Sequence, residues 1–277
     1  MAFVSKLLLI AAFAFGLSAQ TLVDWTTQVA NKPVIDVRSL GAKGDRIADD
    51  SPAFQSAFNH AVSAGGCVQI PPGIYKIGSP ISIVLPISGD NNPKGLCVNG
   101  SGPTSVLMVA NGTGGISIQG SIGYGFELAY LSHFKVQAAP STPTGFGIKL
   151  VGVAGFGLHN IHIDGSNGAM AYGIQLIATQ QGYIKGGLNF RARIGVSLER
   201  TNDIGSNGVE ISGVSFNDVD EGLRVAAVDD GSFHSNHMTF SRYGIHVMRA
   251  AADLILSIRI TSKVTRMVRS FKKAAAR

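Results

Sequence analysis

The chain has 277 residues, a formal net charge of +6, and only 14% charged residues. The positive charge is concentrated at one end, because residues 249–277 hold eight basic residues and one acid, which leaves −1 for the remainder. A near-neutral body excludes the broad basic surface typical of a nucleic-acid-binding protein. The length fits one folded domain, and a glycine content well above the usual share of about 7% indicates many turns.

The first 20 residues have the layout of a secretory signal. Lys6 gives a positive start, Leu7–Phe15 is an unbroken apolar run, and Leu17-Ser18-Ala19 offers small residues for cleavage. A transmembrane anchor is the alternative, but the run is shorter than the roughly 20 residues that a bilayer requires. We therefore expect a secreted or extracellular protein, periplasmic in a Gram-negative cell, with no transmembrane segment and with its folded domain at residues 21–248.

Residues 50–66 predict a helix that closes one end of a larger fold. Asp50 or Ser51 can cap it, and Pro52 suits its first turn. Apolar side chains then follow with helical spacing and glycines end the pattern; they are Phe54, Ala57, Phe58, Ala61 and Val62, followed by Gly65 and Gly66. Three nearby acids, Asp45, Asp49 and Asp50, could hold calcium. Hydrogen-bond acceptance in the turn and cap is the preferred interpretation.

Five phrases with the pattern glycine, apolar, polar, apolar predict a repeated structural unit. They begin at Gly147, Gly173, Gly195, Gly222 and Gly244, in steps of 26, 22, 27 and 22 residues. A second apolar–polar–apolar series lies between them, at residues 134–136, 161–163, 188–190, 214–216 and 238–240. A unit this small cannot bury its own apolar face, so neighbouring units must cover it. We predict an all-β parallel solenoid of roughly eight coils over residues 34–248, capped by the N-terminal α-helix.

In such a stack, side chains at equivalent outward positions form rows with a spacing of about one strand. The glycine phrases give the row Lys149, Gln175, Ser197, Arg224 and His246. The second series gives Lys135, His162, Asn189, Ser215 and Thr239, and beside it Gln137, Asp164, Arg191, Asn217 and Ser241. Such rows suit an extended polysaccharide, whose hydroxyls also repeat, but every β-solenoid has solvated polar faces. The candidate substrate-binding residues are Lys149, His162, Asp164, Arg191 and Arg224.

One segment, residues 36–104, carries a family resemblance. Its pattern reads Gly-Ala-x-Gly-Asp, then Asp-Asp, a helix, Gly-Gly-x-Val and Pro-x-Gly-x-Tyr. The matching residues are Gly41, Ala42, Gly44, Asp45, Asp49, Asp50, Gly65, Gly66, Val68, Pro71, Gly73 and Tyr75. Two residues depart from the pattern: Arg46 stands where it has glycine, and Ser51 where it has threonine. This segment resembles the start of the pectate-lyase-like domain of rhamnogalacturonases, epimerase-like proteins and many phage tailspikes. The resemblance implies a right-handed parallel β-helix over residues 34–248, a polysaccharide partner, and room for calcium as a cofactor.

Carboxylates are the candidate catalytic groups. Glycosidic hydrolysis needs two of them, and a lyase acting on a uronic acid needs a base and a cation. The candidates are Asp203, Asp218, Asp220, Glu221, Asp229 and Asp230. We favour Asp203, Asp229 and Asp230, whose placement is similar to the acidic pairs of polygalacturonases, although the Gly-His-Gly and Arg-x-Lys elements of those enzymes are absent. His234 and His237 lack a third ligand, so no metal site is predicted.

Two hypotheses about function follow. The first is a secreted lyase, hydrolase or epimerase that acts on an acidic polysaccharide. The second is a non-catalytic β-helix that binds carbohydrate or attaches to a surface. A phage tailspike fragment agrees less well with the secretory signal.

The two cysteines, Cys67 and Cys97, are 30 residues apart, which is close to one coil. They could lie on adjacent coils and be joined, or remain buried thiols. We slightly prefer thiols, because a register shift of one residue would turn them to opposite faces.

After residue 248 the coil pattern stops. Apolar residues at helical spacing follow; they are Ile260, Val264, Met267, Val268 and Phe271. The basic tail at residues 249–277 is interpreted as an aberrant or truncated C-terminus, or else as an amphipathic helix that binds a membrane or a partner.

Overall fold

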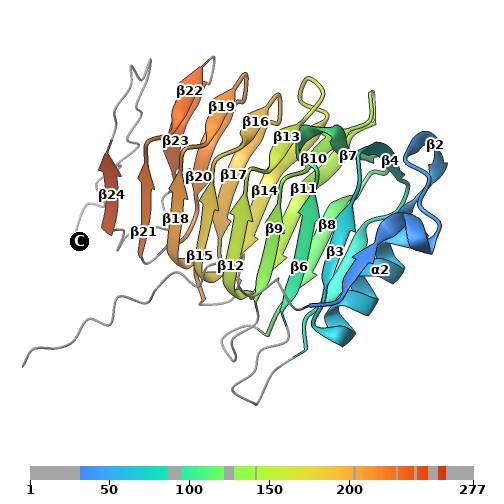
Figure 1. The fold of residues 1–277 in the computed structure, drawn as a ribbon. Coiled ribbons are helices and arrows are strands. Elements are labelled where there is room, and N and C mark those ends of the chain that lie inside the picture. Colours follow the sequence, from blue (N-terminus) through green and yellow to red (C-terminus); the bar gives the residue numbers. More distant parts are fainter. Residues whose placement is uncertain are drawn as a thin grey trace, which may run out of the picture. The chain divides into compact units, whose positions relative to one another are not determined.

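The computed structural model describes residues 32–86, 95–121, 128–140, 142–201, 204–228, 230–239, 242–248 and 255–259. They form a right-handed parallel β-helix with one α-helix against its N-terminal end (Figure 1). The predicted fold class is therefore confirmed. The predicted signal at residues 1–20 lies outside the described residues. No described helix is both long and apolar enough to cross a bilayer.

Three parallel sheets form the sides of the coils. Sheet A contains β1 (Val34–Asp36), β3 (Cys67–Ile70), β6 (Leu96–Gly100), β9 (Ala129–Ser132), β12 (Ala154–His159), β15 (Gln180–Lys185), β18 (Asn207–Ser212), β21 (Asp230–His234) and β24 (Ile255–Arg259). Sheet B contains β2 (Asp45–Asp49), β4 (Gly73–Ile77), β7 (Ser105–Val109), β10 (Lys135–Ala138), β13 (His162–Asp164), β16 (Leu188–Phe190), β19 (Ser215–Asn217) and β22 (His237–Thr239). Sheet C contains β5 (Ile81–Val84), β8 (Gly114–Gln119), β11 (Thr144–Val151), β14 (Met170–Ile177), β17 (Ile194–Glu199), β20 (Glu221–Val225) and β23 (Tyr243–Val247).

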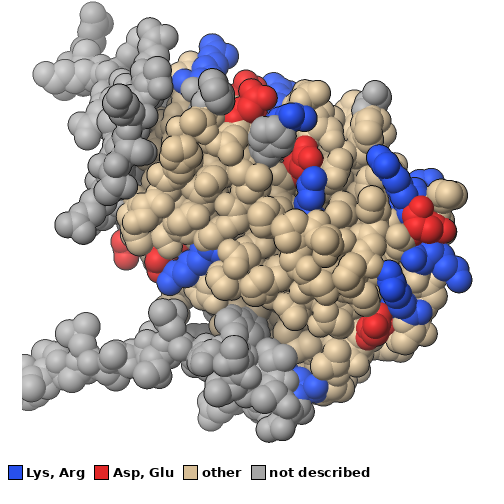
Figure 2. Space-filling view, turned by 45° about the horizontal axis from the view of Figure 1, so that its top comes forward, with Lys and Arg blue, Asp and Glu red and all other residues tan. Residues whose placement is uncertain are grey.

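The core is a set of inward apolar rows. On sheet C one row consists of Ile116, Ile148, Ile174, Val196 and Leu223, all at most 1% exposed and paired in register. Each coil buries its side chains against those of the next coil, because a single coil has too little apolar surface to fold alone. On the face shown in Figure 2, charged side chains are sparse and mixed in sign.

The repeated glycine is explained by contact between backbones. A Cβ built on Gly147 would lie 2.7 Å from the carbonyl oxygen of Gly173 in the next coil. The same contact recurs from Gly173 to Gly195, at 2.6 Å, and from Gly195 to Gly222, at 2.7 Å. Any side chain here would separate the coils, so the glycine phrase repeats because the coils touch backbone to backbone.

The corners between sheets differ in length. From β9 onward, two residues separate each sheet A strand from the following sheet B strand. The first of the two has a positive φ in every case; these residues are His133, Asn160, Gly186, Gly213 and Ser235. The corner between sheets B and C is longer and less uniform, with five residues after β10 and β13 but three after β16 and β19.

The N-terminal cap is α2 (Ser51–Ala64), preceded by the short 3-10 helix η1 (Val37–Leu40). Its stripe of Phe54, Ala57, Phe58 and Ala61 is buried, and Gly65 ends it in the left-handed conformation, as predicted. A second 3-10 turn, η2 (Gly102–Thr104), precedes β7.

The acids near this cap bind backbone groups, as the preferred interpretation holds. Asp45 accepts hydrogen bonds from the N–H groups of Ile47 and Ala48. Asp49 accepts from the N–H groups of Ser51 and Gly78. The carboxylate of Asp50 turns away from the helix and accepts from the N–H groups of Lys43 and Gly44.

The two cysteines form a disulfide, so the preference for free thiols was wrong. Cys67 on β3 pairs in register with Cys97 on β6, their Cα atoms are 4.4 Å apart, and their sulfurs are bonded. The 30-residue separation equals one coil with no register shift, which places both side chains on the same face.

One polar row was predicted with the wrong phase. Ile163 pairs with Asn189, so Asn189 points inward and is 1% exposed, while Leu188 takes the outward place beside His162. The asparagine fits inside because Gly173 has no side chain: a Cβ there would clash with Asn189 Oδ1. In the same way, Thr239 pairs with Asn217 and lies on the neighbouring outward row.

Beyond the predicted boundary at residue 248, β24 adds a strand to sheet A by pairing with β21. The helix expected from Ile260 onward lies outside the described residues.

Candidate binding groove on sheet C

The polar row predicted from the glycine phrases is confirmed on the outer face of sheet C. Lys149, Gln175, Ser197, Arg224 and His246 occupy equivalent positions on five successive coils. A second outward row lies one residue before the repeated glycines and is richer in aromatic side chains; it contains Phe146, Tyr172, Ile194, Glu221 and Tyr243. Parallel pairing without shifts keeps both rows straight along the stack.

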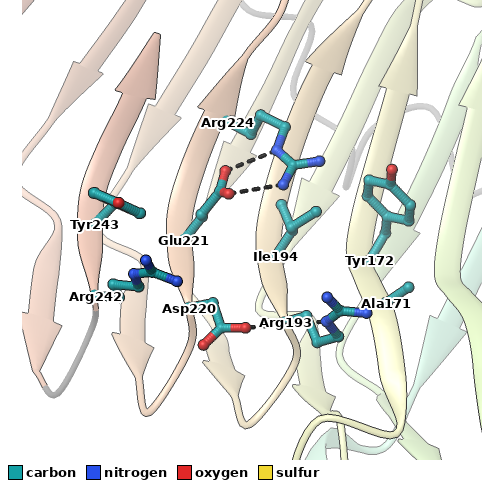
Figure 3. Close-up of a pocket in the computed structure, with 9 residues that line it drawn as sticks. All are labelled: Ala171, Tyr172, Arg193, Ile194, Asp220, Glu221, Arg224, Arg242 and Tyr243. Atoms are coloured by element: carbon teal, nitrogen blue, oxygen red, sulfur yellow. Dashed lines mark hydrogen bonds and ion pairs between the residues drawn. The ribbon is translucent and has the colours of Figure 1, made fainter. Parts of the chain in front are cut away.

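These rows border a cavity of about 240 Å³, here called the sheet C cavity (Figure 3). Its lining residues come from four coils: Ala171, Tyr172, Arg193, Ile194, Asp220, Glu221, Arg224, Arg242 and Tyr243. Three arginines against two carboxylates give the lining a formal charge of +1. Two tyrosines add flat apolar surface, so the cavity offers both charge and ring-stacking contacts.

Glu221 is held in place by the side chains of Arg224 and His246. Arg224 donates two hydrogen bonds of 2.7 Å, one to each carboxylate oxygen. His246 Nδ1 lies 3.0 Å from Glu221 Oε2, close enough for an ion pair although not aligned as a hydrogen bond. Burial opposes ionisation, but the contacts with Arg224 and His246 outweigh it and hold the pKa of Glu221 below its usual value. Glu221 is therefore a fixed carboxylate.

Asp220, in contrast, is loosely held. Its Oδ2 lies 4.0 Å from Arg193 Nε, and both side chains are mostly exposed, at 63% and 67%. Figure 3 shows Asp220 between Arg193 and Arg242, which occupy equivalent positions on the coils to either side. The Arg242 guanidinium lies 5.2 Å from the ring centre of Tyr243. An exposed ion pair of this kind is weak, so a bound anion can displace Asp220 from Arg193.

The five predicted substrate-binding residues fall on two sheets. Lys149 and Arg224 share the sheet C row but are three coils apart, and Lys149 Nζ lies 4.5 Å from the Phe146 ring centre. His162 and Asp164 are on β13 of sheet B, and Arg191 lies in the turn after β16. The sequence pattern therefore combined two separate surfaces.

On sheet B, the candidate residue Asp164 forms an ion pair with Lys135. Lys135 Nζ lies 2.9 Å from Asp164 Oδ2, across adjacent coils. Burial, followed by the charge of Lys135, lowers the pKa of His162 below its usual value. On this strand His162 therefore lies beside an ion pair whose two charges already satisfy each other.

The structure describes one of the three favoured catalytic acids, Asp230. Asp203 and Asp229 lie outside the described residues, and Asp230 is exposed at the start of β21 on sheet A, away from the lining of the sheet C cavity. Asp220 and Glu221, which had been ranked below them, line the cavity. Reading the glycine phrases two residues further back would have found Arg193, Asp220 and Arg242, each two residues before a repeated glycine.

Calcium does not fit the described part of the chain. It contains no group of three or more acidic, histidine or cysteine side chains that could hold a metal ion. The two acids of the sheet C cavity are outnumbered by its arginines, an arrangement that favours an anionic ligand.

Taken together, the fold and the cavity define a right-handed parallel β-helix with a charged groove along one outer face. Residues 34–246 match the family model described as rhamnogalacturonase A/epimerase, pectate lyase-like. The chain belongs to this family, as the resemblance in its N-terminal segment implies.

Individual relatives differ in how much of the chain they match. An exopolygalacturonase of Arabidopsis thaliana is 44% identical over 45 residues, which is 16% of this chain and 10% of that protein. ORF18 of Geobacillus virus E2 superposes with a TM-score of 0.58 at 17% identity, over 76% of this chain and 42% of the other. The catalytic unit of an α-1,3-glucanase from Streptomyces thermodiastaticus gives a TM-score of 0.47 at 15% identity, over 78% and 43%. The viral match supports the fold alone, and this chain spans less than half the length of each of the three proteins.

Proposed function

We propose that the protein acts on an acidic polysaccharide, which it binds in the sheet C cavity. The observation that carries the proposal is the row Arg193, Asp220 and Arg242, which places two exposed cations on either side of a loosely held carboxylate. A uronate carboxylate can pair with either arginine. Tyr172 on β14 and Tyr243 on β23 belong to the neighbouring outward row and offer ring faces for sugar C–H groups. Membership of a family described by rhamnogalacturonase and epimerase supports a carbohydrate ligand.

The favoured chemistry is proton abstraction from the sugar carbon that bears the carboxylate. Asp220 takes this proton, and the electron pair moves onto the substrate carboxylate, where Arg193 and Arg242 stabilise the added negative charge. The carbanion then takes a proton from a water molecule on the opposite face, and the proton held by Asp220 neutralises the hydroxide left behind; this is epimerisation. Alternatively, it expels the oxygen on the adjacent carbon, which takes the proton held by Asp220 and leaves as an alcohol; this is elimination. Asp220 suits the role because it is exposed to the cavity and loosely paired.

Hydrolysis by the two acids of this cavity is less well supported. A hydrolase needs one carboxyl group protonated, to act on the leaving oxygen. Glu221 is the only other acid in the lining of this cavity, and its hydrogen bonds with Arg224 and its contact with His246 lower its pKa and so favour the ionised form. The proposal is therefore an elimination or epimerisation.

Secretion is also part of the proposal. Disulfides persist in oxidising compartments, and the Cys67–Cys97 bond agrees with the signal expected at residues 1–20. An extracellular location would bring the protein into contact with cell-wall or matrix polysaccharides.

The test is Asp220→Asn assayed on polygalacturonate. Elimination is followed by ultraviolet absorbance of the new double bond, and epimerisation by deuterium uptake at the proton-losing carbon in heavy water. We expect the variant to bind substrate but to turn over at least about 100-fold more slowly. Asp218→Asn is the matched control, since Asp218 is exposed two residues earlier and does not line the cavity. Equal loss in both variants would contradict a catalytic role for Asp220.

The alternative is a non-catalytic carbohydrate-binding protein, for which the same ring faces and arginines are sufficient. In that case the wild-type protein binds polygalacturonate without turnover, and Arg193→Ala with Arg242→Ala abolishes binding. If neither turnover nor binding to polygalacturonate or another polyuronate is found, the proposal is wrong.

A further inference from the structure

Two histidines from adjacent coils meet at the outer side of sheet A. His159 is the last residue of β12, and His133 is the first residue of the corner that follows β9 in the preceding coil. Their ring centres are 5.1 Å apart, and the ring planes are nearly perpendicular, at 82°. Neither histidine lines the sheet C cavity. The pair is therefore a second cluster of titratable side chains that the proposed function does not use.

The backbone holds the two residues at this separation. The N–H group of His133 donates to the carbonyl oxygen of His159, at 3.0 Å. Ser132, the residue before His133, pairs in register with His159. Both histidines thus lie at the ends of hydrogen-bonded strands and not in a long loop. A pair built on rigid elements is preorganised for a ligand.

The separation of the rings suits a shared metal ion. Two imidazoles bound through nitrogen to one tetrahedral ion, with metal–nitrogen distances of about 2.0–2.1 Å, have their ring centres about 5 Å apart. The observed 5.1 Å agrees with this value. The rings meet edge to face, and the side chain of His159 is exposed, so its ring can turn without any movement of the backbone. Such a turn aims one nitrogen of each ring at a common point.

One nitrogen of His133 has a lone pair in a weak contact. Its Nε2 lies 3.4 Å from Nδ2 of Asn160, the equivalent corner residue of the next coil. An amide nitrogen donates hydrogen bonds and does not accept them, so Nε2 is the acceptor. A hydrogen bond of this length is weak. A metal ion can therefore take the lone pair in place of the amide.

The charge next to the pair is balanced. Lys185 follows His159 in the same outward row, and an unpaired ammonium there would repel a metal ion. However, Lys185 Nζ lies 3.1 Å from Glu210 Oε2, which neutralises much of its charge. Since the described residues hold no group of three or more acidic, histidine or cysteine side chains fit for a metal, the protein would supply two imidazoles and water the other ligands.

We propose that His133 and His159 together bind a divalent transition metal ion, with Cu²⁺ preferred to Ni²⁺ and Zn²⁺. Imidazole nitrogen suits all three ions, and affinity at such ligands is greatest for Cu²⁺ in the first-row series. Ca²⁺ takes oxygen ligands and should not bind here. Water in the remaining positions leaves the site open, unlike a closed structural site. The inference does not rest on the proposed function, because the pair shares no residue with the sheet C cavity.

The experiment is isothermal titration calorimetry of Cu²⁺ into the metal-free full chain without an affinity tag, as wild type, His133→Asn, His159→Ser and the double variant. Asparagine already occupies the equivalent corner in the next coil and tolerates the positive φ of His133, and serine precedes His159 in its row. We expect each single variant to bind at least about tenfold more weakly than wild type. The double variant should be no weaker than the singles, because one imidazole alone does not chelate. His60→Ala, at an exposed residue of α2, is the control and should bind like wild type.

Three results would overturn the proposal. If wild type binds Cu²⁺ no more tightly than the double variant, the two rings form an aromatic contact only. If one single variant loses affinity and the other does not, a lone surface histidine is the ligand. If the same variants remove binding of Ca²⁺, the class of ion is wrong. Unfolding free energies without metal should be equal in all variants, which separates loss of a ligand from loss of the fold.

Discussion

In the N-terminal cap, the carboxylates of Asp49 and Asp50 accept hydrogen bonds from backbone N–H groups, whereas in the sheet C cavity Asp220 and Glu221 face arginine and histidine side chains. A backbone donor can leave its partner only if the chain unfolds locally. A side-chain donor can rotate away and bind a ligand. We therefore expect changes in the cap to cost folding free energy and changes in the cavity to cost binding or turnover.

The largest effect should come from the disulfide next to the cap. Replacing Cys67 and Cys97 together by serine opens a loop of 30 residues, and the expected loss of unfolding free energy is about 3–4 kcal/mol. Chemical denaturation of the purified double variant measures it, with dithiothreitol-treated wild-type protein as an independent comparison. Polyuronate binding at low temperature should be kept, and a selective loss of binding would contradict the division between cap and cavity.

Gly195→Ala tests whether the cavity region also contains purely structural positions. The new Cβ would lie 2.7 Å from the Gly222 carbonyl oxygen and 2.6 Å from the Phe216 ring. We expect a loss of about 3 kcal/mol in unfolding free energy, because neither the backbone nor the buried ring can move away cheaply. The matched control is Gly112→Ala, whose Cβ meets nothing closer than 4.0 Å and which should unfold like wild type.

Asp50→Asn tests the cap directly. Asp50 is 2% exposed and accepts from two backbone N–H groups, while asparagine retains only one acceptor oxygen. One part-buried N–H then lacks a partner, at an expected cost of about 2 kcal/mol in denaturation experiments. Asp45→Asn, at an exposed acid of the same turn, should cost clearly less. A similar loss in both variants would indicate that burial of the carboxylate is unimportant.

Glu221→Gln should have the smallest effect on folding, about 1 kcal/mol, because Arg224 is one-quarter exposed. The effect depends on pH. The folded pKa of Glu221 lies below the unfolded value, so the stabilisation is fully present above the unfolded pKa and is lost as pH falls through the folded pKa. Unfolding free energies of wild type and variant should therefore differ at about pH 6, and the difference should shrink as the pH falls below the usual range of a glutamate. A difference that is constant with pH would exclude the ion pair as its cause.

Much of the fold could be predicted because the glycine period reflects a direct contact between backbones. The glycine that begins the phrase at Gly147 recurs at the same place in successive coils, because the backbones touch there. The residue two positions after each of these glycines, such as Lys149 or Arg224, therefore also takes the same outward place in every coil. The second series lacks such an anchor. Its pattern of apolar and polar residues is misleading at Asn189, where a polar side chain is buried beside Gly173.

The site was harder to predict because its residues lie where strands begin. Arg193, Asp220 and Arg242 fall in or beside turns, and acids in turns are common for reasons unrelated to catalysis. Only the register of the coils brings these three side chains together. The disulfide shows the same limit, since a spacing of 30 residues agrees with a bond only once the pairing of β3 and β6 is known.

The unequal corners of the coils have a consequence for how proteins of this architecture diversify. From β9 onward, the two-residue corner between sheets A and B keeps one left-handed residue in each coil, so an insertion there would have to rebuild that turn. The corner between sheets B and C already varies from three to five residues with no loss of strand pairing. Lengthening or shortening these turns, one coil at a time, is thus a route by which new ligand preferences can arise while the scaffold is inherited unchanged.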